Sequence, residues 1–256
     1  MLSETSANER FAEAVERAQS RERGMHGSVG TQNEKLIHAA LKNYYAPYAD
    51  EQEIKIGSFF ADAVSEDGIF EIQTKSLYRL IPKLRTFLEF SRVNVVHPVI
   101  SESRTLFINS DSSEVVSLSN PRKTRSWLDV FEELYSLREL LQNENLTIII
   151  TKLKIEKRVY FKGEKIPDLR SKSARKKCVI EKYPLELVDE IRLENPRDYQ
   201  RFLPDNLPEC FTKAELSKAA KEAKSSLRTE VLRSVGIIEK VGKKSNSFVY
   251  KRSQNG

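Results

Sequence analysis

FFADAVSEDGIFEIQTKS, residues 59–76, predicts two β-strands joined by a tight turn at residues 65–68. Side chains on a strand alternate between its two faces, so Glu71, Gln73 and Lys75 share one face. Counting back from the turn, Asp62 is expected to face the same side. An apolar strand that carries an aspartate generally needs it, because burying an unpaired carboxylate is costly. The stretch therefore predicts a polar site on one face of a small sheet.

The segments around this stretch predict a mixed α/β core. TQNEKLIHAALKNYYAP (31–47) is typical of a capped helix, with Thr31 as N-cap and Glu34 three residues later. EQEIKI (51–56) adds a strand before the quoted pair. SLYRLIPKLRTFLEFS (76–91) returns to helical spacing, and VNVVHPVI (93–100) has the pattern of a buried strand. Residues 30–100 thus predict the order helix, three strands, helix, strand.

The residue types on the predicted polar face indicate phosphodiester chemistry. Asp62, Glu71 and Glu34 are expected to converge, with Lys75 beside them. Two or three carboxylates around one point bind a hard divalent cation such as Mg²⁺ or Mn²⁺. Such an ion lowers the pKa of a bound water and neutralises charge on a scissile phosphate. A nearby lysine can orient the nucleophile or stabilise the charged phosphate in the transition state.

The order of elements and the polar face resemble the PD-(D/E)XK, or restriction-endonuclease-like, nuclease superfamily. The resemblance covers residues 30–100 and implies an αβββαβ core, a mixed sheet flanked by helices. It implies that Asp62 is the motif aspartate and Lys75 the motif lysine, with Gln73 in the middle position as in Mrr-like Gln-x-Lys members. Glu71 would be a further acid on this face, and Glu34 the helix glutamate. In an alternative register Glu71-Ile72-Gln73 is the motif, and glutamine takes the lysine position.

The C-terminal stretch predicts a second small fold. ECFTKAELSKAAKEAKSSLRTEVLRSVGIIEKVGKKSNSFVYKR (209–252) is interpreted as two helices followed by a strand, a basic turn and a strand. This order resembles a winged helix-turn-helix, in which the second helix enters the major groove and the wing contacts the backbone. Seven residues are the expected DNA contacts: Ser225, Ser226, Arg228, Thr229, Arg233, Lys243 and Lys244.

The distribution of charge agrees with a nucleic-acid partner. The chain carries a net charge of +6, but residues 1–150 hold 17 Lys and Arg against 22 Asp and Glu, whereas residues 151–256 hold 26 against 15. A basic half beside an acidic half suggests that the C-terminal part meets a polyanion. The segment FKGEKIPDLRSKSARKKC (161–178) is expected to be a basic loop, with two short helices following between residues 184 and 203.

Several classes of protein are excluded by composition. No run approaches the roughly 18 apolar residues that cross a bilayer, so no membrane partner is expected, and the charged N-terminus shows no signal peptide. Cys178 and Cys210 are interpreted as two free thiols, which suit a reducing cytoplasm. The expected domains are an N-terminal helical arm (1–28), a nuclease-like domain (29–160), a basic connector (161–207) and a winged helix (208–256).

The sequence predicts a magnesium-dependent nuclease that acts on DNA and is targeted by its winged helix. RNA is the other possible polymer, since the same chemistry cleaves both. A homodimer is expected because cutting a duplex needs two active sites. The alternative prediction is a non-catalytic DNA-binding or regulatory protein built on a degenerate nuclease fold.

Overall fold

A computed structural model describes residues 6–24, 33–124, 127–220 and 226–253. The fold is mixed α/β, with a large mixed sheet flanked by helices. The large sheet has the strand order β1-β2-β3-β4-β7-β8, and β5 and β6 also pair with β4. The elements up to β4 are α1 (Ala7–Gly24), α2 (Asn33–Tyr45), η1 (Ala49–Glu51), β1 (Gln52–Ile56), β2 (Phe59–Ser65), β3 (Gly68–Ile72), η2 (Leu77–Leu80), α3 (Ile81–Phe87) and β4 (Val93–Asn109).

The second half of the chain adds two long strands and a three-stranded sheet. Its elements are β5 (Val115–Leu118), β6 (Arg122–Lys123), η3 (Trp127–Val130), α4 (Phe131–Leu134), η4 (Tyr135–Leu137), β7 (Leu146–Phe161), α5 (Lys172–Lys176), β8 (Val179–Leu193), η5 (Pro196–Phe202), β9 (Cys210–Thr212), α6 (Lys213–Ala219), α7 (Ser226–Ser234), β10 (Ile238–Lys244) and β11 (Ser247–Arg252).

The elements group into two units that interleave along the sequence. One unit comprises residues 1–66, 98–125 and 151–190, and the other comprises residues 67–97, 126–150 and 191–256. Strands β4, β7 and β8 each begin in one unit and end in the other. Each unit is therefore assembled from three separate segments of the chain.

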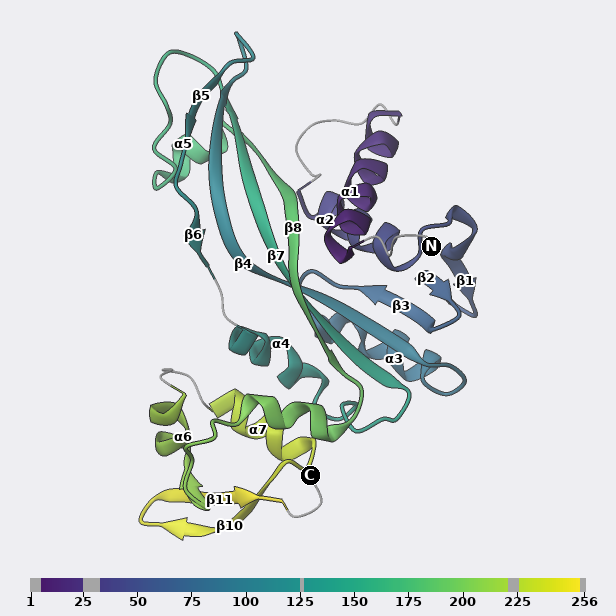
Figure 1. The fold of residues 1–256 in the computed structure, drawn as a ribbon, viewed down its shortest axis with the longest axis vertical. Helices are drawn as coiled ribbons and strands as arrows, with labels where there is room; N and C mark the ends of the chain where they lie inside the picture. Colours follow the sequence, from purple (N-terminus) through teal and green to yellow (C-terminus); the bar gives the residue numbers. More distant parts are fainter. Residues whose placement is uncertain (1–5, 25–32, 125–126, 221–225, 254–256) are drawn as a thin grey trace. The chain divides into compact units, whose positions relative to one another are not determined.

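Helix α1 belongs to the core of the first unit. It lies beside α2 (Figure 1), and its apolar stripe is buried. The ring of Phe11 meets that of Tyr44 edge-on at 5.9 Å between centroids. The Asn43 side-chain amide donates to the Ala14 carbonyl at 3.2 Å. The predicted helical arm is thus a packed helix, with Phe11, Ala14, Val15 and Ala18 buried.

The three predicted strands form as expected. β1 and β2 pair antiparallel from Gln52↔Ala63 to Ile56↔Phe59. Gly68 opens β3 at φ +108°, and a Cβ added there would lie 2.5 Å from the Arg92 carbonyl oxygen. Only glycine suits this position, because that carbonyl accepts the Ile69 amide at 2.9 Å. The close approach brings β3 beside the start of β4.

Strands β3 and β4 are parallel and are connected by η2 and α3. Their register runs from Ile69↔Val93 to Ile72↔Val96. A parallel pair needs such a crossover connection, which matches the predicted strand, helix, strand order. The buried residues of this pair include Ile69, Phe70, Ile72, Val93, Val95 and Val96. The predicted buried strand is confirmed, although β4 continues much further, to Asn109.

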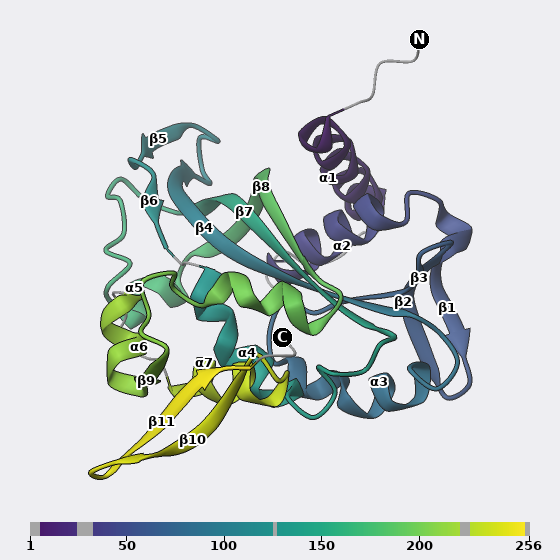
Figure 2. The same cartoon turned by 60° about the horizontal axis from the view of Figure 1, so that its bottom comes forward.

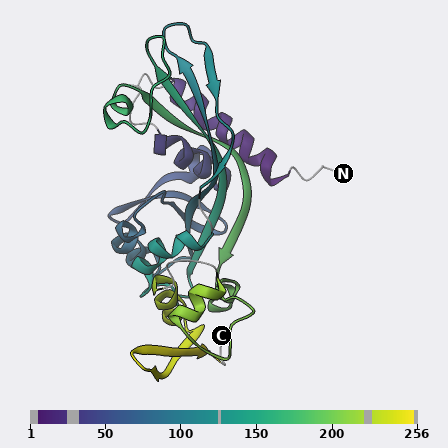
Figure 3. The same ribbon diagram turned by 90° about the vertical axis from the view of Figure 1, so that its left-hand side faces the viewer.

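The outer part of β4 forms an antiparallel ribbon with β5 (Figure 3), in which Leu106 pairs with Leu118 and Phe107 with Ser117. The prediction of two short helices between residues 184 and 203 is wrong in part. Residues 179–193 form strand β8, and only Pro196–Phe202 is helical, as a 3₁₀ segment. Leu187 and Ile191 are both buried, and their four-residue spacing imitated a helix.

The C-terminal region contains the predicted helices and strands. β9, α6, α7, β10 and β11 follow one another, and the three strands pair in the order β10-β11-β9. In Figure 2, β10 and β11 form a two-stranded ribbon. Helix α6 begins with a capping box in which Thr212 and Glu215 hydrogen-bond reciprocally. Donation by the Thr212 amide and hydroxyl lowers the pKa of the Glu215 carboxyl below its ordinary value.

Two predictions from composition can be compared with the structure. Cys178 and Cys210 are both free thiols, as expected. None of the helices in the described parts of the chain is long and apolar enough to cross a membrane.

Candidate functional site

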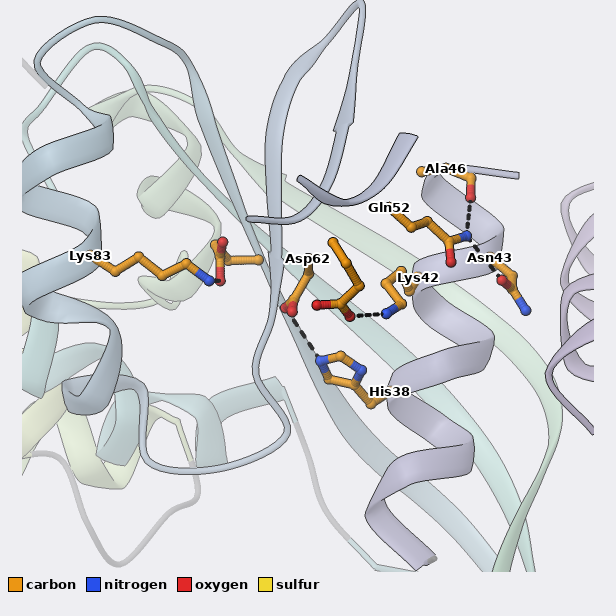
Figure 4. A network of polar contacts seen from close by, with 9 residues as sticks. His38, Lys42, Asn43, Ala46, Gln52, Asp62 and Lys83 are labelled. Carbon is orange, nitrogen blue, oxygen red and sulfur yellow. Dashed lines mark hydrogen bonds and ion pairs between the residues drawn. The ribbon is translucent and has the colours of Figure 1, made fainter. Parts of the chain in front are cut away.

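Asp62 lies on β2 between two fully buried alanines, Ala61 and Ala63. Its side chain is 18% exposed, and its Oδ2 atom lies 3.3 Å from Nε2 of His38 on α2 (Figure 4). Because a carboxylate oxygen can only accept, the imidazole donates this hydrogen bond. The sequence pattern found the aspartate but not its histidine partner.

A second acid lies on the neighbouring strand. The β1–β2 register pairs Gln52 with Ala63 and Ile54 with Ala61, so Glu53 stands opposite Asp62. Glu53 forms an ion pair with Lys42 of α2 (Figure 4). His38 and Lys42 are four residues apart and therefore share one face of the helix. Each acid on these two strands thus has a basic partner on α2.

Glu71 occupies the buried interior of the other unit. Its side chain is 1% exposed, and Oε2 accepts from the Lys83 ammonium of α3 at 2.6 Å (Figure 4). Lys83 itself is 16% exposed, and its Nζ lies 5.7 Å from the centroid of the Phe87 ring. The expected polar face of β3 therefore includes a lysine that comes from the following helix.

Residues 73–77, here called the β3 turn, are held by several hydrogen bonds. The Gln73 amide donates to the Val96 carbonyl at 2.9 Å, and the buried His97 ring donates through Nδ1 to the Gln73 carbonyl at 2.8 Å. Ser76 adopts a left-handed conformation at φ +59°. The Glu133 carboxylate accepts from the amides of Ser76 and Leu77 at 3.1 and 2.8 Å.

The β3 turn therefore has a defined geometry. The Gln73 side-chain amide donates to the Lys75 carbonyl, across the turn. The Lys75 side chain is exposed, in contrast to the nearly buried Lys83. The turn thus presents an exposed lysine side chain on a backbone that several hydrogen bonds hold in place.

The expected convergence on one metal ion stays a prediction. Glu34 lies in the first turn of α2, but its side chain falls outside the described part of the chain. Asp62 and Glu71 belong to different units. Within the described residues no group of three His, Cys, Asp or Glu side chains could hold a metal ion. In each unit the predicted acid instead has a basic partner, His38 or Lys83.

Lys83 could have been identified from the sequence. Leu80, Leu84 and Phe87 form the buried stripe of η2 and α3, and Lys83 falls between them at the same helical spacing. A lysine on an apolar stripe signals a buried partner, because an unpaired buried ammonium is costly. Glu133 gave no comparable signal, since the two backbone amides that donate to it lie 57 and 56 residues away in sequence.

The predicted recognition helix faces differently from expectation. Arg228 and Thr229 of α7 are 1% and 0% exposed, so the expectation that they project from the surface is wrong. An error of one residue in the predicted helical phase is enough to move a position from the exposed to the buried face. Neighbouring positions differ by about 100° around the helix axis. Ser226 is exposed, and Arg233 is 53% exposed and pairs with Glu230 at 3.1 Å. Ser225 lies outside the described residues.

The basic turn between β10 and β11 is exposed as predicted. Lys243 and Lys244 are both on the surface. Lys240 and Lys243 place Nζ at 3.4 and 5.0 Å from the centroid of the Phe248 ring, which is itself 38% exposed. An aromatic ring flanked by ammonium groups forms cation–π contacts. The ribbon therefore carries a cluster of positive charge around one accessible ring.

Comparisons with known proteins complete the description of the site. A protein of Treponema pallidum (strain Nichols), named "Uncharacterized protein", is 28% identical over 233 residues, which cover 90% of this chain and 89% of the relative. No solved structure matches. Residues 35–194 match a family model that includes Asp62, Glu71 and Lys83 and spans more than half of the chain. The chain therefore belongs to the family described as Domain of unknown function (DUF8091).

Proposed function

We propose that this protein is a nuclease that hydrolyses phosphodiester bonds in DNA. The observation that carries the proposal is the order α2, β1, β2, β3, α3, β4, with β3 parallel to β4. This is the helix, three strands, helix, strand order for which the sequence resembles the PD-(D/E)XK superfamily. Asp62 lies on the middle strand of the three, Glu71 lies near the end of the third, and Gln73 follows directly after that strand.

The proposed cofactor is Mg²⁺ or Mn²⁺, with Asp62, Glu71 and Glu34 as its ligands. Among the described residues Glu71 is bonded to Lys83 and Asp62 to His38, and no group of three His, Cys, Asp or Glu side chains could hold a metal ion. We therefore derive no catalytic step through a metal ion. What this chain's own residues supply is positive charge beside a carboxylate, which can stabilise a phosphate as charge develops on it.

The C-terminal region supports DNA as the substrate. The order β9, α6, α7, β10, β11 with a β10-β11-β9 sheet supports the proposed winged helix-turn-helix. Ser226, Arg233, Lys243 and Lys244 remain on its surface as candidate phosphate and base contacts. A duplex cutter needs two such active sites, so a homodimer on DNA is part of the proposal.

A second candidate function is non-catalytic DNA binding on a degenerate nuclease fold. The buried Glu71–Lys83 ion pair favours it, because a carboxylate neutralised by an ammonium is a poor metal ligand. In this case the β10–β11 ribbon would be the part of the protein that binds DNA. RNA is the alternative polymer for either candidate.

Cleavage of supercoiled plasmid DNA distinguishes the two candidates. We expect the wild-type protein to nick the plasmid with Mg²⁺ or Mn²⁺ and to stop when EDTA is added. Asp62→Ala should lower the rate by about 10²–10³-fold, the usual loss when one transition-state contact is removed. The matched control is Asp50→Ala, an exposed aspartate in the same unit, which should cut at the wild-type rate. A wild-type protein that binds DNA but cuts neither DNA nor RNA would favour the second candidate.

The basic ribbon should contribute a measurable share of the salt dependence of DNA binding. Each phosphate contact contributes about 0.9 to the slope of log K against log salt concentration on duplex DNA. Replacing Lys243 and Lys244 together with alanine should therefore lower the slope by about 1.8. Fluorescence anisotropy with a labelled duplex at several salt concentrations measures this. Lys55→Ala, an exposed lysine on β1, is the control, and an unchanged slope in the double variant would exclude the ribbon from the interface.

A further inference from the structure

The β10–β11 ribbon ends in a turn that is open to solvent. Residues 239–248, which include the two-residue turn Ser245-Asn246, are all exposed, and in Figure 2 this end of the ribbon extends beyond α7. The other end is anchored, because Tyr250 is 2% exposed and its ring centroid lies 6.4 Å from that of Phe211. Side chains near the turn can therefore meet another molecule without a change in the core.

Phe248 is an apolar side chain that the core does not use. It is the second residue of β11, and 38% of it is exposed. Val241 on β10 is exposed as well, at 45%. Single apolar side chains are common on protein surfaces, so exposure alone does not indicate a binding site. The groups around the Phe248 ring decide what it can bind.

Two ammonium groups lie against the Phe248 ring. Lys243 stands directly opposite Phe248 in the strand register, with Nζ 5.0 Å from the ring centroid. Lys240 places Nζ 3.4 Å from the same centroid. The register shifts between Lys240 and Gly242, and such a bulge redirects side chains, which lets both lysines reach one ring. The ring thus offers an apolar surface with two positive charges beside it.

A nucleotide matches both features, since its base is flat and its phosphate is negatively charged. Aromatic side chains among basic residues bind single-stranded nucleic acids in this way, with bases stacked on the rings and the backbone held by positive charge. In a closed duplex each base face is covered by its neighbour, so a ring reaches it only if the stack is opened. An unpaired base offers its face without that cost.

We propose that Phe248 is a stacking site for an unpaired base, and that Lys240 and Lys243 bind the adjoining phosphates. The inference rests on the proposed DNA binding by the C-terminal region and adds a preference to it. The ribbon binds single-stranded or locally unpaired DNA more tightly than a closed duplex. Phe248 supplies this preference, whereas the lysines supply affinity for either form.

Binding requires the base to replace an ammonium group on the ring. A cation–π contact at an exposed site strengthens an equilibrium by about 2–5-fold. Stacking of a base on an aromatic side chain is worth about 5–150-fold. Stacking therefore outweighs the contact that it replaces. The displaced lysine, on its flexible stem, can then bind a phosphate of the same strand.

Fluorescence anisotropy of the full chain tests the preference with a labelled single strand and with the duplex of the same sequence. EDTA is present, so that no metal-dependent cleavage occurs. Phe248→Ala should weaken binding of the single strand by about 5–150-fold. Binding of the duplex should weaken by less than about twofold, with its salt dependence unchanged because no charge is lost. The control is Val241→Ala, which removes exposed apolar surface from the same ribbon but no ring and should bind both forms like wild type.

Phe248→Trp gives a direct readout of stacking. Trp127 is the only tryptophan of the chain, so the variant is made together with Trp127→Phe. The single strand should quench the fluorescence of the new indole, and the duplex should leave it nearly unchanged. Phe248→Leu keeps an apolar side chain without a ring and should bind the single strand as weakly as Phe248→Ala. Circular dichroism checks that each variant is folded, as expected for substitutions at an exposed position.

Three results would overturn the stacking site. One is a loss in Phe248→Ala that is equal for single strand and duplex, and another is no loss in either. The third is equal competition by poly-glutamate, a polyanion without bases, for the single strand on wild type and on Phe248→Ala. In that case the ribbon binds charge alone.

Plasmid cleavage separates this inference from the proposed nuclease. If the wild-type protein cuts no DNA but binds single strands through Phe248, the nuclease proposal fails and the stacking site stands. If the wild-type protein nicks the plasmid and Phe248→Ala keeps full affinity for single strands, the stacking site fails and the nuclease proposal stands.

Discussion

Replacing Lys83 with methionine is expected to lower the free energy of unfolding by about 3–5 kcal/mol. The substitution keeps a long side chain against Leu84 and Phe87 but removes the ammonium from Glu71 Oε2. A carboxylate that is 1% exposed would then lose a positive charge that offsets its desolvation. Urea unfolding followed by circular dichroism measures the change.

The double variant Glu71→Gln with Lys83→Met separates the contribution of the ion pair to stability from that of side-chain packing. If the loss comes from an uncompensated charge, the double variant should be more stable than Lys83→Met alone. Lys55→Met, on an exposed side chain of β1, should lie within about 0.5 kcal/mol of wild type. Equal stability of Lys83→Met and wild type would show that the ion pair contributes nothing to folding.

Replacing Phe11 with alanine should lower the free energy of unfolding by about 3–5 kcal/mol. The Phe11 side chain is 1% exposed, and its ring packs edge-on against Tyr44 of α2. Removing it leaves a cavity between the two helices, and the surroundings close only part of such a space. Thermal or urea unfolding of the full chain gives the value.

The control for this prediction is Glu13→Ala on the exposed side of the same helix. It should change stability by no more than about 0.5 kcal/mol, since alanine is a good helix former and no buried group is lost. If Phe11→Ala is as stable as this control, α1 is dispensable to the core and behaves as the arm that the sequence alone predicted.

The order of helices and strands from α2 to β4 was predictable because the local sequence patterns agree with the long-range strand pairing in this region. The turn at residues 65–68 and the alternation of apolar and polar residues in 70–73 defined β2 and β3 before any contact was known. Pro82 near the start of the helical stretch and the apolar run at 93–100 defined α3 and β4. Each of these signals involves neighbouring residues only.

Strand β8 was missed because its burial does not alternate. Buried Leu187 and Ile191 are four residues apart, with exposed Val188 and Asp189 between them, so the spacing matched a helix. Pro184 also argued against a strand, although proline is accepted in strands at a sheet edge. The sheet order places β8 at one end, where this tolerance applies.

The site was predicted in part for a similar reason. Asp62 and Glu71 stood out because each is an acid in an apolar strand. Their partners His38 and Lys83 lie 24 and 12 residues away, on helices whose rotation about their own axes is set by packing. The same rotation decides whether Arg228 faces solvent or core. The spacing of residues along the sequence does not determine the rotation of a helix about its axis to better than one residue.

The interleaving of the two units has a consequence for synthesis on the ribosome. The unit that holds Glu71, Lys83 and the β3 turn also needs residues 191–256. Its first segment leaves the ribosome long before that last one and waits several seconds at ordinary translation rates of about 5–20 residues per second. During this interval the apolar strands β3 and β4 lack the packing partners that the later residues of the same unit provide. The nascent chain is then a natural client for chaperones that hold exposed hydrophobic segments.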